Sequence, residues 1–203
     1  MRLLSPAFLA LALWSSAAVL AGCGGAAAQM QVTSPFTEEH ETAFENGVDF
    51  IDDPSILEGA YLTSWEDDID RRVSLADAVA LVTVTTYRED VDLDRRLTYH
   101  LITVVDRERH GSVPAELSLT VRQGERGFNS VRGNSARLLN QHFVLFLKWA
   151  DDGGRVVARW HLSPATDRIL RRVNSLIERT HTPEDDRRRV IVTDHRGHDG
   201  DDD

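Results

Sequence analysis

Two segments of this chain are apolar at nearly every position, and they constrain the fold more than any other feature. The segment AVALVTVTTY spans residues 78–87 and is rich in β-branched side chains, and HFVLFLKW spans residues 142–149. Short runs of this kind are typical of strands that are covered on both faces. The sequence therefore predicts a sheet whose central strands are buried on both sides.

Three further segments have strand character. Residues 97–106 repeat the β-branched composition, and ELSLTVR at 116–122 alternates strictly between apolar and polar side chains. Such alternation indicates one buried and one solvated face. The turn sequence DDGG at 151–154 leads into a fifth strand at 155–162. Because the connections are mostly short, we expect an antiparallel arrangement.

Helices are expected before and after these strands. Thr37 and Ser64 begin candidate helices over about 37–47 and 65–75, and SARLLNQ at 135–141 is a short third candidate. Ser163 resembles an N-cap with Pro164 at the first position of a final helix. That helix has one apolar stripe, which we expect to pack in the core of the domain and not to bind a partner. The stripe consists of Ile169, Leu170, Val173, Leu176 and Ile177. The fold class is α+β, a small curled antiparallel sheet or OB-like barrel of about five strands with flanking helices.

The N-terminal segment has the composition of an export signal. Arg2 is followed by an uncharged apolar run from Leu3 to Gly22, which serines, Pro6 and several alanines dilute below the apolarity of a membrane-spanning helix. The run ends in Leu20-Ala21-Gly22-Cys23, which resembles the lipobox of bacterial lipoproteins. The resemblance implies cleavage before Cys23, a diacylglycerol on its thiol and an acyl chain such as palmitate on its amino group.

Cys23 is the only cysteine among 203 residues. Without lipid it would be an unpaired thiol in an oxidising compartment, as in an ordinary cleaved signal with a chance cysteine, which is the alternative reading. Two or three acyl chains hold a protein firmly on a membrane. Gly24 follows Cys23 where an aspartate signals inner-membrane retention in the Gram-negative family, so the resemblance implies the outer membrane.

The chain is divided into four parts. Residues 1–22 are the expected lipoprotein signal peptide, 23–35 the lipidated cysteine and a flexible tether, 36–181 one globular domain, and 182–203 an acidic, solvated tail. The net charge of −10 argues against nucleic acid as a partner. Over residues 74–162 the hydrophobic pattern resembles extracytoplasmic OB-like barrels, the netrin-like modules among them. The inhibitors of that group use disulfides and an N-terminal cysteine at a metal, features that this sequence lacks.

The candidate motifs for chemistry have simpler structural explanations. Asp90, Asp92 and Asp94 alternate as at the start of an EF-hand loop, but Arg95 replaces the turn glycine and Leu101 the bidentate glutamate, so we expect a solvated hairpin loop. Ser163, His161 and Asp167 lie close together in the sequence and could form a nucleophile, a base and an acid. Ser163 is instead explained as a helix cap, and His161 is expected at the surface.

The glycine-rich loop at 124–134 is the candidate ligand loop. Arg126, Phe128 and Arg132 could grip an anionic group or a glycan, although Phe128 could instead fold into the core. His195 and His198 in the acidic tail would make only a weak metal site. No cofactor or committed metal site is expected.

From these features we expect a membrane-anchored envelope lipoprotein that acts as a binding or scaffolding module for an envelope protein or a glycan. The alternatives are an exported enzyme of unknown class and a metal-binding or small-ligand-binding lipoprotein.

Overall fold

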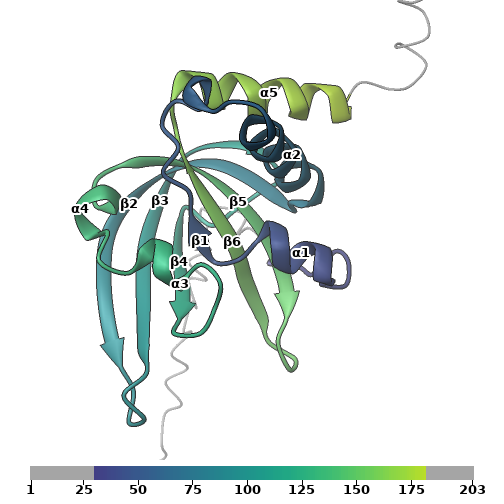
Figure 1. Cartoon of the computed structure of the whole chain (residues 1–203). Helices are drawn as coiled ribbons and strands as arrows, with labels where there is room; N and C mark the ends of the chain where they lie inside the picture. The colour runs from purple at the N-terminus through teal and green to yellow at the C-terminus, as the bar shows by residue number, and fades with distance from the viewer. Residues whose placement is uncertain (1–29, 182–203) are drawn as a thin grey trace, which may run out of the picture.

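A computed structural model describes residues 30–181, which form one six-stranded curled sheet with helices on its outer face (Figure 1). The strands are β1 (Gly47–Val48), β2 (Ala78–Val91), β3 (Leu97–His110), β4 (Glu116–Arg122), β5 (His142–Asp151) and β6 (Val156–Pro164). The helices are α1 (Glu38–Ala43), η1 (Pro54–Ile56), α2 (Ala60–Leu75), α3 (Phe128–Val131), α4 (Ser135–Leu138) and α5 (Asp167–His181). The predicted fold class is confirmed.

The strand order is β1-β6-β5-β2-β3-β4. All neighbours are antiparallel except β1 and β6, which pair in parallel through Gly47 with His161 and Val48 with Leu162. The order β5-β2-β3-β4 is a Greek key, in which the chain leaves β4 and returns beside β2. An OB-like barrel is a partly open Greek-key barrel of this kind.

The two apolar segments are central strands with both faces buried, as the sequence predicts. On β5, Phe143, Leu145 and Leu147 point into the barrel, while Val144 and Phe146 point outward. The outer side chains pack against the helical layer of α1, α2 and α5. This alternation divides the apolar interior into a barrel core and a helix-covered core.

A β-bulge curls the sheet. The pairing of β2 with β3 shifts between Val84 and Thr86, so that Val84 and Tyr87 both pack in or against the barrel core. A bulge increases local twist and bends the strand that carries it. The long β2–β3 hairpin therefore bends around the core and brings β4 toward β6.

The final helix begins later than the sequence predicts. β6 continues through Ser163 to Pro164, and α5 begins at Asp167. The Ser-Pro pair therefore ends a strand and does not begin the helix, because Ser163 donates its hydroxyl hydrogen to Asp49 instead of capping α5. The predicted apolar stripe does lie in the core, with Ile169, Val173 and Leu176 buried.

The segment before Phe36 also packs on the domain. Thr33 and Ser34 accept hydrogen bonds from the Nζ of Lys148, at 3.4 and 2.9 Å, and Lys148 is 2% exposed. Asp77 pairs with the same ammonium at 2.7 Å. The packed part of the chain thus extends to the N-terminal side of the predicted boundary at residue 36.

Candidate ligand-binding groove

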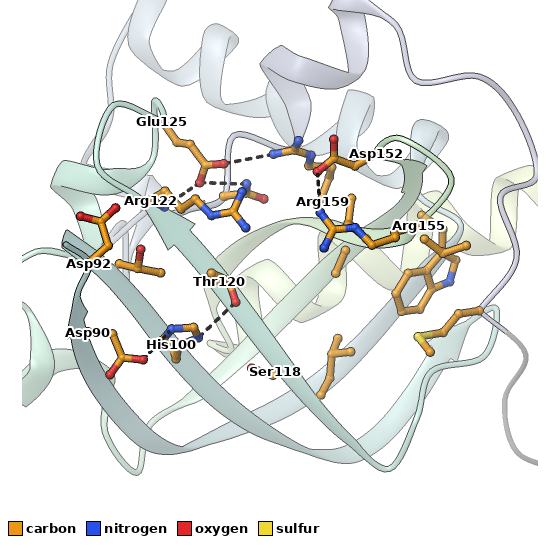
Figure 2. Close-up of a pocket in the computed structure, with 18 of the residues that line it drawn as sticks. Asp90, Asp92, His100, Ser118, Thr120, Arg122, Glu125, Asp152, Arg155 and Arg159 are labelled. Atoms are coloured by element: carbon orange, nitrogen blue, oxygen red, sulfur yellow. Dashed lines mark hydrogen bonds and ion pairs between the residues drawn. The ribbon is translucent and has the colours of Figure 1, made fainter. Parts of the chain in front are cut away.

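The half-barrel is open between β4 and β6, and this seam forms a groove of about 650 Å³ (Figure 2). β4 is the terminal strand of the sheet, and the pairing pattern makes β6 run parallel to it across the seam. The indole nitrogen of Trp160 donates to the carbonyl of Thr120 at 3.1 Å and bridges the seam at one point. The rest of the groove is walled by the two strand edges and by the ends of the β2–β3 and β5–β6 hairpins.

Apolar side chains form part of the lining. Leu117 and Trp149 belong to the barrel core and reach the groove from β4 and β5. Val156 is 42% exposed at the start of β6, and Met30 is 52% exposed at the N-terminal end of the described chain. A ligand in the groove would therefore cover apolar surface that water now contacts.

Glu125 holds the two walls together. Its carboxylate accepts hydrogen bonds from the backbone N–H of Arg122 at 2.8 Å, from the side chain of Asn46 at 3.3 Å and from the guanidinium of Arg159 at 3.2 Å. These donors belong to β4, to the segment before β1 and to β6. One side chain thus fixes the spacing of three elements around the groove.

A close backbone contact positions this carboxylate. A Cβ atom at Gly127 would lie 2.3 Å from the carbonyl oxygen of Asn46, so only glycine allows the loop after β4 to reach the segment that leads into β1. The backbone N–H of Gly127 donates to the carbonyl of Glu45 at 2.9 Å in the same contact. Gly127 is therefore required by the close packing of two backbone segments, and it is not only a loop residue.

The outer rim on β2 and β3 carries a second charge cluster. Asp90 lies 3.2 Å from the Nε2 of His100 and 2.9 Å from the guanidinium of Arg88. The Nδ1 of His100 is 3.4 Å from the hydroxyl of Thr120, which connects the cluster to β4. The cluster thus links β2, β3 and β4 at this rim.

Two arginines extend toward each other from opposite walls of the groove. Figure 2 shows Arg122 of β4 and Arg155 at the β5–β6 hairpin pointing into the same space, with Asp92 on the far side of Arg122. Within the described residues the guanidinium of Arg122 has no hydrogen bond or ion pair, and Arg155 has a single carboxylate contact, with Asp152 at 3.9 Å. The pair is therefore available to an anionic group.

The predicted ligand loop is divided between core and surface. Phe128 is 5% exposed and packs on Tyr99 at a ring distance of 5.3 Å inside the barrel, where burial raises the pKa of Tyr99 to about 12. Phe128 is therefore a core residue, which was the second of the two positions that the sequence allowed for it. Arg126 and Arg132 are exposed, and Arg126 donates to Thr42 at 3.4 Å. Ligand binding by these two arginines remains a prediction.

The three alternating aspartates do not gather around a cation site. Asp90 pairs with Arg88 and His100, and Asp92 accepts the backbone N–H of Arg96 at 2.8 Å in the hairpin turn. Among residues 30–181, no group of three histidine, cysteine or acidic side chains is placed to hold a metal ion. Cys23, His195 and His198 lie outside the described residues.

His161 is buried, contrary to the surface position expected from the sequence. It is 1% exposed, and its Nε2 lies 3.2 Å from the Asp49 carboxylate, which also accepts the hydroxyl of Ser163 at 2.5 Å. Because the serine bonds the aspartate and not the histidine, this cluster does not pair a nucleophile with a base. Asp167 is not part of the cluster.

The pKa values in this cluster follow from burial and from Arg72. Burial lowers the pKa of His161 and the positive charge of Arg72 lowers it further, which outweighs the raising effect of Asp49 and Glu45. Burial alone would raise the pKa of Asp49, but the bonds from His161 and Ser163 and the charge of Arg72, 3.7 Å away, hold it below its ordinary value. The cluster ties β6 to α2 and is structural.

Sequence reasoning missed the groove because its residues come from distant segments. Arg122 ends an alternating strand, Arg155 follows the DDGG turn, and Glu125 is the second residue of the glycine-rich loop. The one available signal was the strict alternation of ELSLTVR, which indicates a strand with one solvated face.

No helix among residues 30–181 is long and apolar enough to cross a membrane. Comparison with known proteins found no matching family model and no matching curated protein.

Proposed function

We propose that this chain is a lipid-anchored envelope protein whose domain binds a partner in the groove between β4 and β6. The observation that carries the proposal is the open seam itself, where apolar side chains and two converging arginines line one concavity. Ligand sites are typically concave and largely apolar, with a few directed polar groups. The groove combines these properties in a chain without a recognisable catalytic motif.

The anchor supports the same reading. Met30, which lines the groove, lies seven positions after Cys23. An extended chain spans at most about 3.6 Å per residue, so a lipid on Cys23 would keep Met30 within about 25 Å of the membrane surface. The groove would then meet partners that lie at the membrane, an envelope protein or a glycan.

Site-specific crosslinking tests the binding function. A photoreactive amino acid at Val156 lies in the groove, and one at Tyr61, 80% exposed on α2, serves as the matched control on the helical side. We expect a discrete crosslinked product in intact cells from position 156 and none from position 61. Equal crosslinking from both positions, or none from either, would contradict a binding role for the groove.

The anchor is tested separately. Cys23→Ala should abolish incorporation of a labelled fatty acid and leave the signal uncut by the lipoprotein peptidase, because the thiol is the acceptor that precedes cleavage in the lipoprotein family. A variant that still carries the label would show that the lipobox reading is wrong.

A further inference from the structure

The groove edge of β4 presents main-chain groups that no strand pairs with. The backbone N–H of Arg122 donates to Glu125, and the carbonyl of Thr120 accepts the indole of Trp160, so both residues turn their main-chain groups away from β3. Successive residues of a strand direct these groups to opposite edges. Ser118, two residues before Thr120, therefore directs its N–H and C=O into the groove.

The facing edge of β6 has the same property. The N–H and C=O of Trp160 bond the side chain and backbone of Asn46, at 3.1 and 2.9 Å, on the side away from β5. Ala158, two residues earlier, directs its main-chain groups to that side as well. In the described chain β1 pairs with β6 only at His161 and Leu162, so no strand covers Ala158.

Exposed strand edges of this kind form templates for another extended chain. Native proteins commonly blunt such edges with proline, lysine or a bulge, but ELSLTVR contains no proline or lysine, and its pairing with β3 is regular. A ligand that offers alternating N–H and C=O groups is an extended polypeptide, which binds by adding a strand. A glycan lacks this repeat.

The charges select among peptides. A peptide on the β4 edge would place alternate side chains toward the apolar floor at Leu117 and Trp149 and the others toward the arginines. The guanidinium of Arg122 has no partner within residues 30–181, and guanidinium groups pair with carboxylates in two parallel hydrogen bonds. An acidic side chain fits this position, whereas a basic one would face an unpaired cation.

We infer that the groove binds an extended acidic peptide segment, which adds a strand to the Ser118 edge of β4 and places a carboxylate between Arg122 and Arg155. This inference rests on the proposed function and specifies its ligand. The partner is therefore an envelope protein with an exposed, extended segment that carries aspartate or glutamate.

A randomised peptide library tests the ligand class. The probe is a set of immobilised twelve-residue peptides, and the protein is the lipid-free mature chain, residues 23–203 with Cys23→Ala. We expect the bound peptides to be enriched in aspartate or glutamate at one position. A bound set without acidic enrichment overturns the inference, and so does selective binding of purified cell-wall glycan fragments in place of peptides.

Variants then test the geometry with the tightest peptide. Ser118→Pro removes the N–H that faces the groove and leaves the bonds to β3, because proline is tolerated where the N–H points away from the sheet. We expect at least a tenfold loss of affinity, with Ser118→Thr within twofold of the parent chain. Methylation of alternate backbone nitrogens in the peptide should give the same loss. Parent-like affinity in a folded Ser118→Pro variant overturns strand addition.

Arg122 provides a second test that does not depend on the folding of the proline variant. Arg122→Ser should weaken binding at least tenfold, while Arg171→Ser, at an exposed position of α5 outside the groove, should leave it unchanged. Arg122→Glu should shift the library toward lysine and arginine at the same position. Equal effects of the two serine variants overturn the inference. Groove-specific crosslinking from Val156 would still stand in that case, so failure of the inference is distinguishable from failure of the proposed function.

Discussion

The only lysine of the chain provides a sharp test of how the domain is held together. The Lys148 side chain is 3% exposed and the Asp77 side chain 9%, with 2.7 Å between the Nζ and the carboxylate. Asp77 also accepts the backbone N–H of Trp149 at 2.9 Å and the hydroxyl of Thr33 at 2.5 Å. Lys148→Met would keep the apolar stem and leave this carboxylate buried without its cation.

The expected cost follows from the asymmetry of buried ion pairs. Removal of one partner from a buried pair costs about 3 to 5 kcal/mol, because the remaining charge is uncompensated, whereas replacement of both charges is often close to neutral. Asp77→Asn retains an oxygen that can accept from Trp149. The double variant Lys148→Met with Asp77→Asn should therefore recover most of the loss, with a coupling energy of about 2 kcal/mol or more.

Denaturant unfolding followed by tryptophan fluorescence measures both quantities. The slope of free energy against denaturant should stay the same in all variants, so that midpoints report stability directly. A cost below about 1 kcal/mol for Lys148→Met, or a double variant no more stable than the single one, would refute the reasoning. It would show that water solvates Asp77 when the ammonium is absent.

Three further predictions concern the cores and the boundaries of the domain. Leu176→Ala should lower the free energy of unfolding by about 2 to 5 kcal/mol, because Leu176 is 8% exposed in the helix-covered core; an unchanged melting temperature would contradict its burial. A chain that begins at residue 36 should unfold more easily than one that begins at residue 30, by about 1 to 3 kcal/mol, because Lys148 loses two hydrogen-bond acceptors; equal unfolding midpoints would argue against this contact. Since the folded pKa of His161 lies below its ordinary value of 6.5, the unfolded state binds protons more readily, and stability present above pH 6.5 should be lost as the pH falls below it. His161→Gln should flatten this dependence in unfolding curves at pH 5 to 7.

The features that could be predicted from the sequence are those that depend on local pattern. Strands at 78–87 and 142–149 follow from β-branched apolar runs, and the stripe of the final helix follows from its period. The start of that helix does not, because a Ser-Pro pair can end a strand as readily as begin a helix. Ser163 takes the first role since Asp49, 114 residues earlier, accepts its hydroxyl.

The burial of His161 is another long-range effect. Alternation along β6 gives it the same face as Arg159, which indicates solvent, but that face is covered by α2 and by the segment that carries Asp49. The hydrogen bond between His161 and Asp49 joins residues 112 positions apart. A local sequence pattern cannot predict a contact between such distant residues. The groove between β4 and β6 could not be predicted for the same reason.

The seam between β4 and β6 stays open because the main-chain groups at one end of it already have other hydrogen-bond partners. A direct ladder between β4 and β6 would use the carbonyl of Thr120 and the N–H of Arg122, but these groups already bond Trp160 and Glu125. Asn46 likewise occupies both main-chain groups of Trp160. Three side chains and the backbone N–H of Asn46 therefore satisfy the edges where the strands are closest, and the ladder cannot begin there. The edges at Ser118 and Ala158 are left to water or to a ligand, which is why an extended chain fits this barrel at that place.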